Sequence, residues 1–202
     1  MSLVYETGDR SFTEKEAAEF GRAYRKLMPP IPEGSVAFVD KIPHNFQRVG
    51  FLLSAFPNAK IINMLRDPRD AGLSKWKVRF LAGGMHYASN QESIAHTANL
   101  YRRYMAHWDA VSRDRILTVP YEKLVADPQT YSQQVAAFCG IEWNETMMRP
   151  EENTTQVRTA SIDQVRNKIS TISVGGWQSV AEHLRPMQDG FDPAHWPEQD
   201  LG

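Results

Sequence analysis

The sequence contains almost no cysteine and almost no excess of charge. Cys139 is the single cysteine among 202 residues, so no intramolecular disulfide can form and a reducing, cytoplasmic compartment is expected. The formal net charge of −1 argues against a general nucleic-acid-binding protein, which would have a clearly basic surface. No apolar run has transmembrane length, and the polar N-terminus does not resemble a signal peptide. These absences predict a protein with neither a nucleic-acid nor a membrane partner.

The sequence also lacks the glycine-rich loop that many phosphate-binding proteins place after their first strand. The pairs Gly83-Gly84 and Gly175-Gly176 have neither the pattern nor the position of such a loop, which argues against a nucleotide kinase. A metal site is not predicted, because the histidines do not show the spacing of zinc ligands. Any anion site must therefore be built from other residues.

What the sequence does contain is an alternation of short apolar runs with helical patterns. With 42% hydrophobic residues, the chain has room for one sizeable core, and we expect a single domain over residues 1–202 with an irregular tail at 188–202. Buried strands are predicted at 36–39, 61–65 and 116–119. Helices are predicted at 13–27, 46–56, from 68 onward, from a cap at Ser89 to 108, at 128–139 and near 177–184. This order is typical of an α/β fold with a parallel sheet.

The stretch 59–74 carries the strongest functional signal. Arg66 follows an apolar strand, and Asp67 with Pro68 has the pattern of a helix N-cap and first turn. Arg66 is therefore expected at the carboxyl end of a strand, where open α/β sheets bind ligands. A plainer alternative stays open, in which Arg66, Arg69 and Asp70 form ion pairs at the start of a helix. The basic residues Lys75, Lys77 and Arg79 further along are compatible with a solvated face.

The motif Arg66-Asp67-Pro68-Arg69-Asp70 with Ser74 resembles the 3′-phosphate-binding motif of the sulfotransferase superfamily, which uses 3′-phosphoadenosine-5′-phosphosulfate (PAPS). Three further segments agree in order, namely DKIPHNF at 40–46, VPYEKLVADP at 119–128 and TASIDQVRNKISTISVGGW at 159–177. The set is most similar to bacterial sulfotransferases that are often fused to tetratricopeptide repeats and are related to tyrosylprotein sulfotransferases. The resemblance extends over roughly residues 13–187.

The resemblance implies a set of cofactor-binding residues for PAPS or adenosine 3′,5′-bisphosphate. Arg66 and Ser74 match the residues that bind the 3′-phosphate, and Tyr121 matches a residue near the nucleotide. The segment that closes over the cofactor is matched by Ser161, Gln164, Arg166, Gly175 and Trp177. Trp177 also has an alternative role as a core anchor for the last helix.

The implied reaction is sulfuryl transfer from PAPS to the hydroxyl or amine of an acceptor that the sequence does not identify. Such chemistry needs positioning, stabilisation of charge and a base for the acceptor proton. Lys41 is the candidate for stabilising the transferred group, and His44 is the candidate base. A structural role for His44 is the alternative.

One family feature is not found, namely the first strand with its 5′-phosphosulfate loop. We therefore expect a three-layer parallel sheet like that of P-loop NTPases, flanked by helices but missing its first strand and loop. Three alternatives follow: the sequence is a fragment, a partner or second copy supplies the strand, or the fold serves another purpose. Whether this chain is an enzyme by itself thus stays open, and a non-catalytic module that binds 3′-phosphoadenosine or acts in assembly is the second hypothesis.

Overall fold

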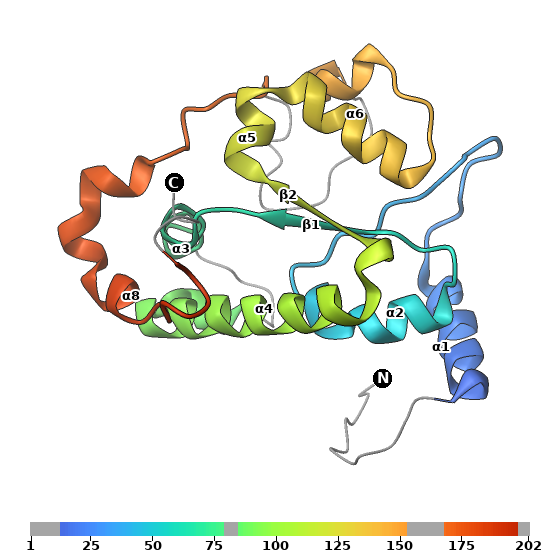
Figure 1. Cartoon of the computed structure of the whole chain (residues 1–202), viewed down its shortest axis with the longest axis horizontal. Coiled ribbons are helices and arrows are strands. Elements are labelled where there is room, and N and C mark those ends of the chain that lie inside the picture. The colour runs from blue at the N-terminus through green and yellow to red at the C-terminus, as the bar shows by residue number, and fades with distance from the viewer. Residues whose placement is uncertain (1–12, 79–84, 153–167, 198–202) are drawn as a thin grey trace. The chain divides into compact units, whose positions relative to one another are not determined.

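The computed structural model describes residues 13–78, 85–152 and 168–197 (Figure 1). The chain divides into two compact units, Met1–Ala59 and Lys60–Gly202, called here the first and the second unit. Each unit is described separately. The expectation of one domain over the whole chain stays a prediction.

The first unit is built on two helices, α1 (Glu14–Leu27) and α2 (Val49–Ala55), with the 3₁₀ helix η1 (Asn45–Arg48) leading into α2. Thr13 caps α1 as predicted, because its side chain accepts the N–H of Glu16 while the Glu16 carboxylate accepts the N–H of Thr13. The two helices meet at Gly21, where an added Cβ would lie 3.2 Å from the carbonyl oxygen of Ala55. A small residue therefore lets α1 approach α2 closely.

The strand predicted at 36–39 is wrong. Residues 36–39 form no strand, and Val36 and Val39 are 89% and 90% exposed instead of buried. No other segment among residues 13–59 is a strand, so within the first unit the apolar run has no neighbour with which to form ladder hydrogen bonds. Apolar composition alone does not make a strand without such a neighbour.

The second unit contains a two-stranded parallel sheet of β1 (Ile61–Leu65) and β2 (Ile116–Pro120), as the sequence predicted at these positions. The strands pair in register from Ile61 with Ile116 to Leu65 with Pro120. Figure 1 shows α4 (Gln91–Ser112) on one side of this sheet, and α5 (Tyr121–Ala126) and α6 (Pro128–Cys139) on the other. The α/β class is confirmed, but the sheet in the described residues is smaller than the predicted one.

Two sequence signals place helix starts correctly and one does not. Asp67 and Asp127 cap α3 (Pro68–Trp76) and α6, each accepting a backbone N–H ahead of a first-turn proline. The predicted cap at Ser89 is wrong by one residue, because the side chain of Asn90 accepts the N–H of Ser93. Helix α5, directly after β2, was not predicted at all.

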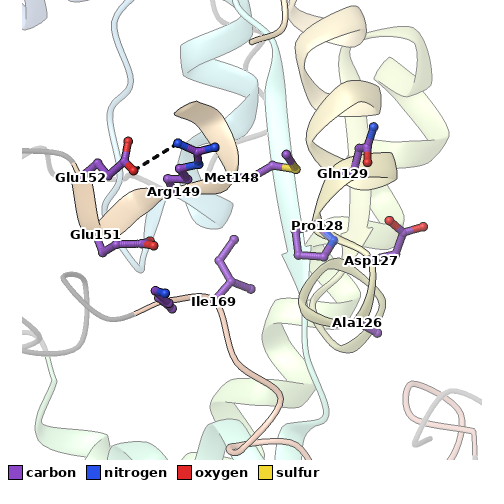
Figure 2. A pocket seen from close by; sticks show the side chains of 10 residues that line it. Ala126, Asp127, Pro128, Gln129, Met148, Arg149, Glu151, Glu152 and Ile169 are labelled. Atoms are coloured by element: carbon purple, nitrogen blue, oxygen red, sulfur yellow. Dashed lines mark hydrogen bonds and ion pairs between the residues drawn. The ribbon is translucent and has the colours of Figure 1, made fainter. Parts of the chain in front are cut away.

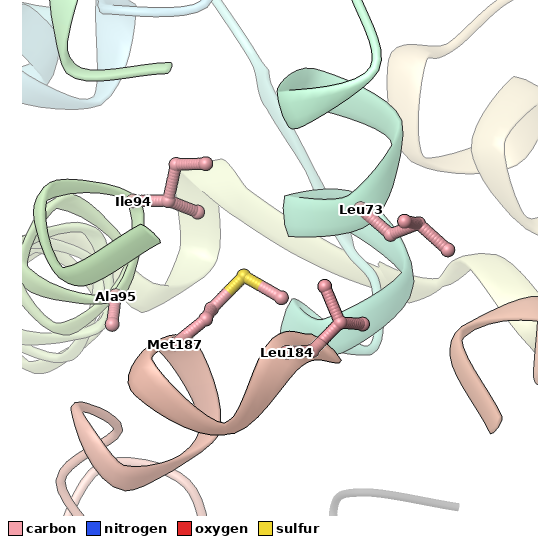
Figure 3. Close-up of a cluster of buried hydrophobic side chains, with 5 residues drawn as sticks. All are labelled: Leu73, Ile94, Ala95, Leu184 and Met187. Atoms are coloured by element: carbon pink, nitrogen blue, oxygen red, sulfur yellow. The ribbon is translucent and has the colours of Figure 1, made fainter. Parts of the chain in front are cut away.

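The core of the second unit lies where α3 and α4 meet the C-terminal helices η6 (Gly176–Leu184) and α8 (Arg185–Asp189). Figure 3 shows its buried side chains, which are Leu73, Ile94, Ala95, Leu184 and Met187. The residues after α8 are irregular up to 197, as predicted, yet Trp196 is only 4% exposed. Residues near the C-terminus therefore help to hold α3, which begins at the candidate site.

Candidate nucleotide-binding site

Arg66 lies at the carboxyl end of β1, between the strand and α3. Its Nη2 donates a hydrogen bond to the carbonyl oxygen of Ser173 at 3.0 Å, and its guanidinium carbon lies 4.5 Å from the centre of the Tyr121 ring. Tyr121 follows the last residue of β2, so the parallel pairing of the two strands brings both side chains to one edge of the sheet. The buried Nε of Arg66 has no hydrogen-bond partner among the described residues.

Ser173 joins Arg66 to Tyr121. While its carbonyl oxygen accepts from Arg66, its hydroxyl lies 3.1 Å from the Tyr121 hydroxyl and shares a hydrogen bond with it. We call Arg66, Tyr121 and Ser173 the Arg66 cluster. Its three members come from distant parts of the chain and hold the guanidinium through neutral groups only.

Arg69 has a different environment from Arg66. It forms an ion pair with Asp67, with Nη2 2.6 Å from Oδ2, and its guanidinium carbon lies 4.0 Å from the centre of the Trp177 ring. Asp67 in turn caps α3 by accepting the Arg69 N–H at 2.8 Å, and its own N–H donates to Glu122 at 2.9 Å. Ion pairing at the start of the helix thus involves Arg69 and Asp67, not Arg66.

Asp70 fastens the segment that carries Ser173 to α3. Its two carboxylate oxygens accept the N–H of Gly175 at 2.7 Å and the N–H of Trp177 at 2.9 Å. Gly175 has a φ of 71°, which glycine adopts without the steric penalty of a Cβ. The carboxylate of Asp70 is only 3% exposed and is satisfied by these backbone groups.

The far part of α3 carries Ser74 and Lys75. Ser74 is exposed, whereas Lys75 is partly buried. Burial lowers the pKa of Lys75, and the positive charge of Arg66 lowers it further. The ammonium group of Lys75 and the guanidinium of Arg66 therefore lie close enough to repel each other.

The structure brings four of the predicted cofactor residues into one network: Arg66, Tyr121, Gly175 and Trp177. Ser74 lies on the same helix as Asp70. Three further predicted residues, Ser161, Gln164 and Arg166, lie outside the described residues. No finding tests the predicted role of any of these residues.

The two predicted catalytic residues, Lys41 and His44, belong to the first unit. Lys41 is exposed, and the His44 ring is half-buried with its centre 6.4 Å from that of Phe46. The segment before them is held by Asp40, whose carboxylate accepts hydrogen bonds from the Tyr24 hydroxyl and from the Asn45 amide at 2.8 Å. Their catalytic roles stay predictions.

Sequence reasoning missed the residues that organise the site. Ser173 and Asp70 were quoted within motifs but given no role, and Glu122 was taken as part of a turn. The bond from Asp70 to Gly175 spans 105 positions, so no local pattern reveals it. The only sequence signal was that both residues belong to segments shared with one family.

A hollow of about 800 Å³ lies elsewhere in the second unit, between the start of α6 and the 3₁₀ helices η4 (Glu145–Met148) and η5 (Pro150–Glu152) (Figure 2). Its lining includes three carboxylates, Asp127, Glu151 and Glu152, against two cations, Arg149 and Lys168. Arg149 is already paired with Glu152 at 3.3 Å. This hollow shares no residue with the Arg66 cluster and has no positive charge to spare for a phosphate.

Two searches of the described residues gave negative findings. None of their helices is both long and apolar enough to cross a bilayer. Across 13–78, 85–152 and 168–197, no three His, Cys, Asp or Glu side chains are grouped so that they could hold a metal ion.

Comparison with known proteins identifies the family. Residues 6–145 match the profile described as "Sulfotransferase family". Because this match covers more than half of the chain, the chain belongs to the sulfotransferase family. Its sequence is also similar to protein-tyrosine sulfotransferases, with 23% identity over 171 residues to that of Drosophila melanogaster and 25% over 183 residues to protein-tyrosine sulfotransferase 2 of Gallus gallus.

These matches cover 76% of this chain but only 34% and 46% of the two relatives. An uncharacterised protein of Aquifex aeolicus (strain VF5) is 34% identical over 190 residues, which is 91% of this chain and 25% of that protein. The chain thus spans less than half the length of these relatives.

A solved structure supports the fold. The sulfotransferase domain of the olefin synthase from Synechococcus PCC 7002 superposes with a TM-score of 0.59 at 22% sequence identity. The match covers 88% of this chain and 64% of that domain. It shows a shared sulfotransferase-domain fold.

Proposed function

We propose that the second unit binds the 3′-phosphoadenosine part of PAPS, with Arg66 as the main ligand of the 3′-phosphate. The observation that carries this proposal is the environment of Arg66, which is fixed by a carbonyl oxygen and an aromatic ring and is given no carboxylate by the described residues. A guanidinium presents a planar fork of donors that matches phosphate oxygens. Membership of the sulfotransferase family supports PAPS as the source of that phosphate, because the family uses it in general.

The neighbouring residues each have a role in this proposal. The Tyr121 ring and the Ser173 carbonyl orient the guanidinium, so that less side-chain freedom is lost when an anion binds. The exposed Ser74 hydroxyl is the second phosphate ligand. Asp70 keeps Trp177 and Gly175 beside α3, where Trp177 stacks on Arg69 and forms one wall of the site.

The reaction we propose is transfer of a sulfuryl group from PAPS to an acceptor hydroxyl or amine. The acceptor atom forms a new bond to sulfur, the bond from sulfur to the phosphate oxygen breaks, and a base takes the acceptor proton. His44 is the proposed base, and Lys41 the proposed cation that stabilises the transferred group. PAPS supplies the activated sulfuryl group, whereas the protein supplies positioning and charge.

Titration calorimetry with adenosine 3′,5′-bisphosphate tests the binding step. The wild-type chain should bind, and Arg66→Met should weaken the affinity by about 10- to 100-fold, as expected for the loss of a charge-assisted contact. Arg113→Met is the matched control, because the Arg113 side chain is 83% exposed and pairs only with Asp109 among the described residues. Equal affinities of the wild type and Arg66→Met would refute the proposal.

A transfer assay with labelled PAPS tests the chemical step separately. Acceptor-dependent release of adenosine 3′,5′-bisphosphate that falls in Lys41→Met and His44→Ala would support the enzyme proposal. Binding without any transfer would instead favour the alternative, a non-catalytic 3′-phosphoadenosine-binding module.

A further inference from the structure

Lys75 differs from the basic residues that follow it. The sequence alone was compatible with a solvated face at Lys75 and Lys77, but only Lys77 is exposed, whereas Lys75 is partly buried. In an α-helix each side chain leans toward the N-terminus of the helix. Lys75 stands one turn after Ala71 and two turns after Asp67, so its stem runs back toward the start of α3, where Arg66 lies.

Two cations therefore lie near each other without a described anion between them. Proximity to Arg66 is one of the two causes that lower the pKa of Lys75, and no carboxylate acts on it. Neither residue forms an ion pair with any other described residue. The acidic residues of the same motif are engaged elsewhere, Asp67 with Arg69 and Asp70 with the N–H groups of Gly175 and Trp177.

This arrangement is unfavourable without a ligand. Like charges in a partly buried site repel more strongly than in water, and burying a cation without a partner adds a desolvation penalty. A doubly charged anion between the two groups removes both effects. The unpartnered Nε of Arg66 is a second, independent sign that a group with hydrogen-bond acceptors belongs there.

We propose that Lys75 is a second cationic ligand of the phosphate subsite formed by Arg66, and that this pair of cations selects a terminal phosphate over a free 3′-hydroxyl. The proposal rests on the proposed function, because it concerns the same subsite. A terminal phosphate carries about −1.5 to −2 charges at pH 7. Arg66 offers it a planar fork and Lys75 a compact point charge, so the two residues contribute differently to one ligand.

Calorimetry on the full chain with two nucleotides tests this role. Adenosine 3′,5′-bisphosphate carries the terminal 3′-phosphate, and adenosine 5′-monophosphate lacks it. In Lys75→Met the affinity for the bisphosphate should fall about tenfold or more, while the affinity for the monophosphate should stay the same. Lys75→Arg should restore most of the loss. Lys77→Met, an exposed neighbour on the same helix end, should bind both nucleotides like the wild type.

A thermal-unfolding experiment checks the charge argument without nucleotide. At low salt and without ligand, Lys75→Met should raise Tm by about 2 °C, because it removes the repulsion but keeps the apolar stem. With saturating bisphosphate the order should reverse. A lower Tm in the ligand-free variant would contradict the two-cation account.

The outcomes separate this inference from the proposed function. If the wild type binds the bisphosphate, Arg66→Met weakens that binding and Lys75→Met does not, the role of Lys75 is refuted while the proposed function stands. An equal loss of affinity for both nucleotides in Lys75→Met also refutes it, because it would indicate a general structural effect. If the wild type binds no bisphosphate, both proposals fail.

Discussion

The carboxylate of Asp70 accepts the backbone N–H of Trp177 at 2.9 Å, across 107 positions of the chain. Its other oxygen accepts the N–H of Gly175, and the same segment presents the Ser173 carbonyl to Arg66. The last residue of the Arg66-to-Asp70 motif therefore helps to orient the first residue through a distant segment. This relationship explains why the motif and the segment near residue 175 occur together.

Asp70→Asn should destabilise the second unit by about 2 kcal/mol, because the amide leaves one of the two buried N–H groups facing an NH₂ group. It should also weaken binding of adenosine 3′,5′-bisphosphate several-fold, since Ser173 loses its anchored position. Urea unfolding and calorimetry measure the two effects. Asp114→Asn, an exposed aspartate, is the control and should change neither. Unchanged stability of Asp70→Asn would show that the anchor is unimportant.

Gly175→Ala should lower stability by roughly 1–2 kcal/mol, because an alanine is strained at a φ of 71°. Gly34 in the first unit has a φ of 81° and no atom near its missing Cβ, so Gly34→Ala carries a similar backbone strain. Only Gly175→Ala should also reduce bisphosphate affinity, since only Gly175 adjoins the Arg66 cluster. Equal binding by both variants would separate the turn at Gly175 from the site.

Local patterns predicted much of the second unit. The caps at Asp67 and Asp127 and the strands β1 and β2 follow from neighbouring residues, and so the sequence reveals them. The run at 36–39 has the same apolar composition as β1, but a strand also needs a paired neighbour, which composition does not encode. The predicted sheet was too large for this reason.

The candidate site was predictable only in part. Arg66 could be placed at a strand end from local pattern, and family resemblance supplied Tyr121, Gly175 and Trp177. The roles of Ser173, Asp70 and Lys75 depend on contacts between distant segments or on the burial of one side chain. Self-association and a strand-donating partner stay predictions.

Tyr101 provides a test of the packing between α4 and the sheet. Its hydroxyl donates to Asn63 Oδ1 at 2.5 Å, and burial raises its pKa to about 12. Tyr101→Phe should reduce the unfolding free energy by about 1–2 kcal/mol at pH 7, because the buried Asn63 oxygen loses its donor.

The pH dependence of this variant has a defined sign. The unfolded tyrosine ionises near pH 10 and the folded one near 12, so its contribution is complete below pH 10 and is lost as the pH rises toward 12. The phenylalanine variant lacks this loss. Urea unfolding should therefore show a deficit that narrows between pH 10 and 12, whereas a constant deficit would contradict the assigned burial.

Leu184→Ala tests the core that positions α3. Leu184 is fully buried among Leu73, Ile94 and Met187, and the truncation should reduce the unfolding free energy by about 2–5 kcal/mol. Val174→Ala, at a 39% exposed position, is the control and should have little effect. A small effect of Leu184→Ala in urea unfolding would show that this cluster does not stabilise the second unit.

Phosphorus-31 NMR of bound adenosine 3′,5′-bisphosphate tests the central claim most directly, because the 3′- and 5′-phosphates give separate resonances. If Arg66 binds the 3′-phosphate, the 3′ resonance should shift on binding and titrate at lower pH than in the free nucleotide, since a nearby cation favours the dianion. Arg66→Met should abolish that change. A 3′ resonance that titrates in the wild-type complex as it does in free solution would contradict the account.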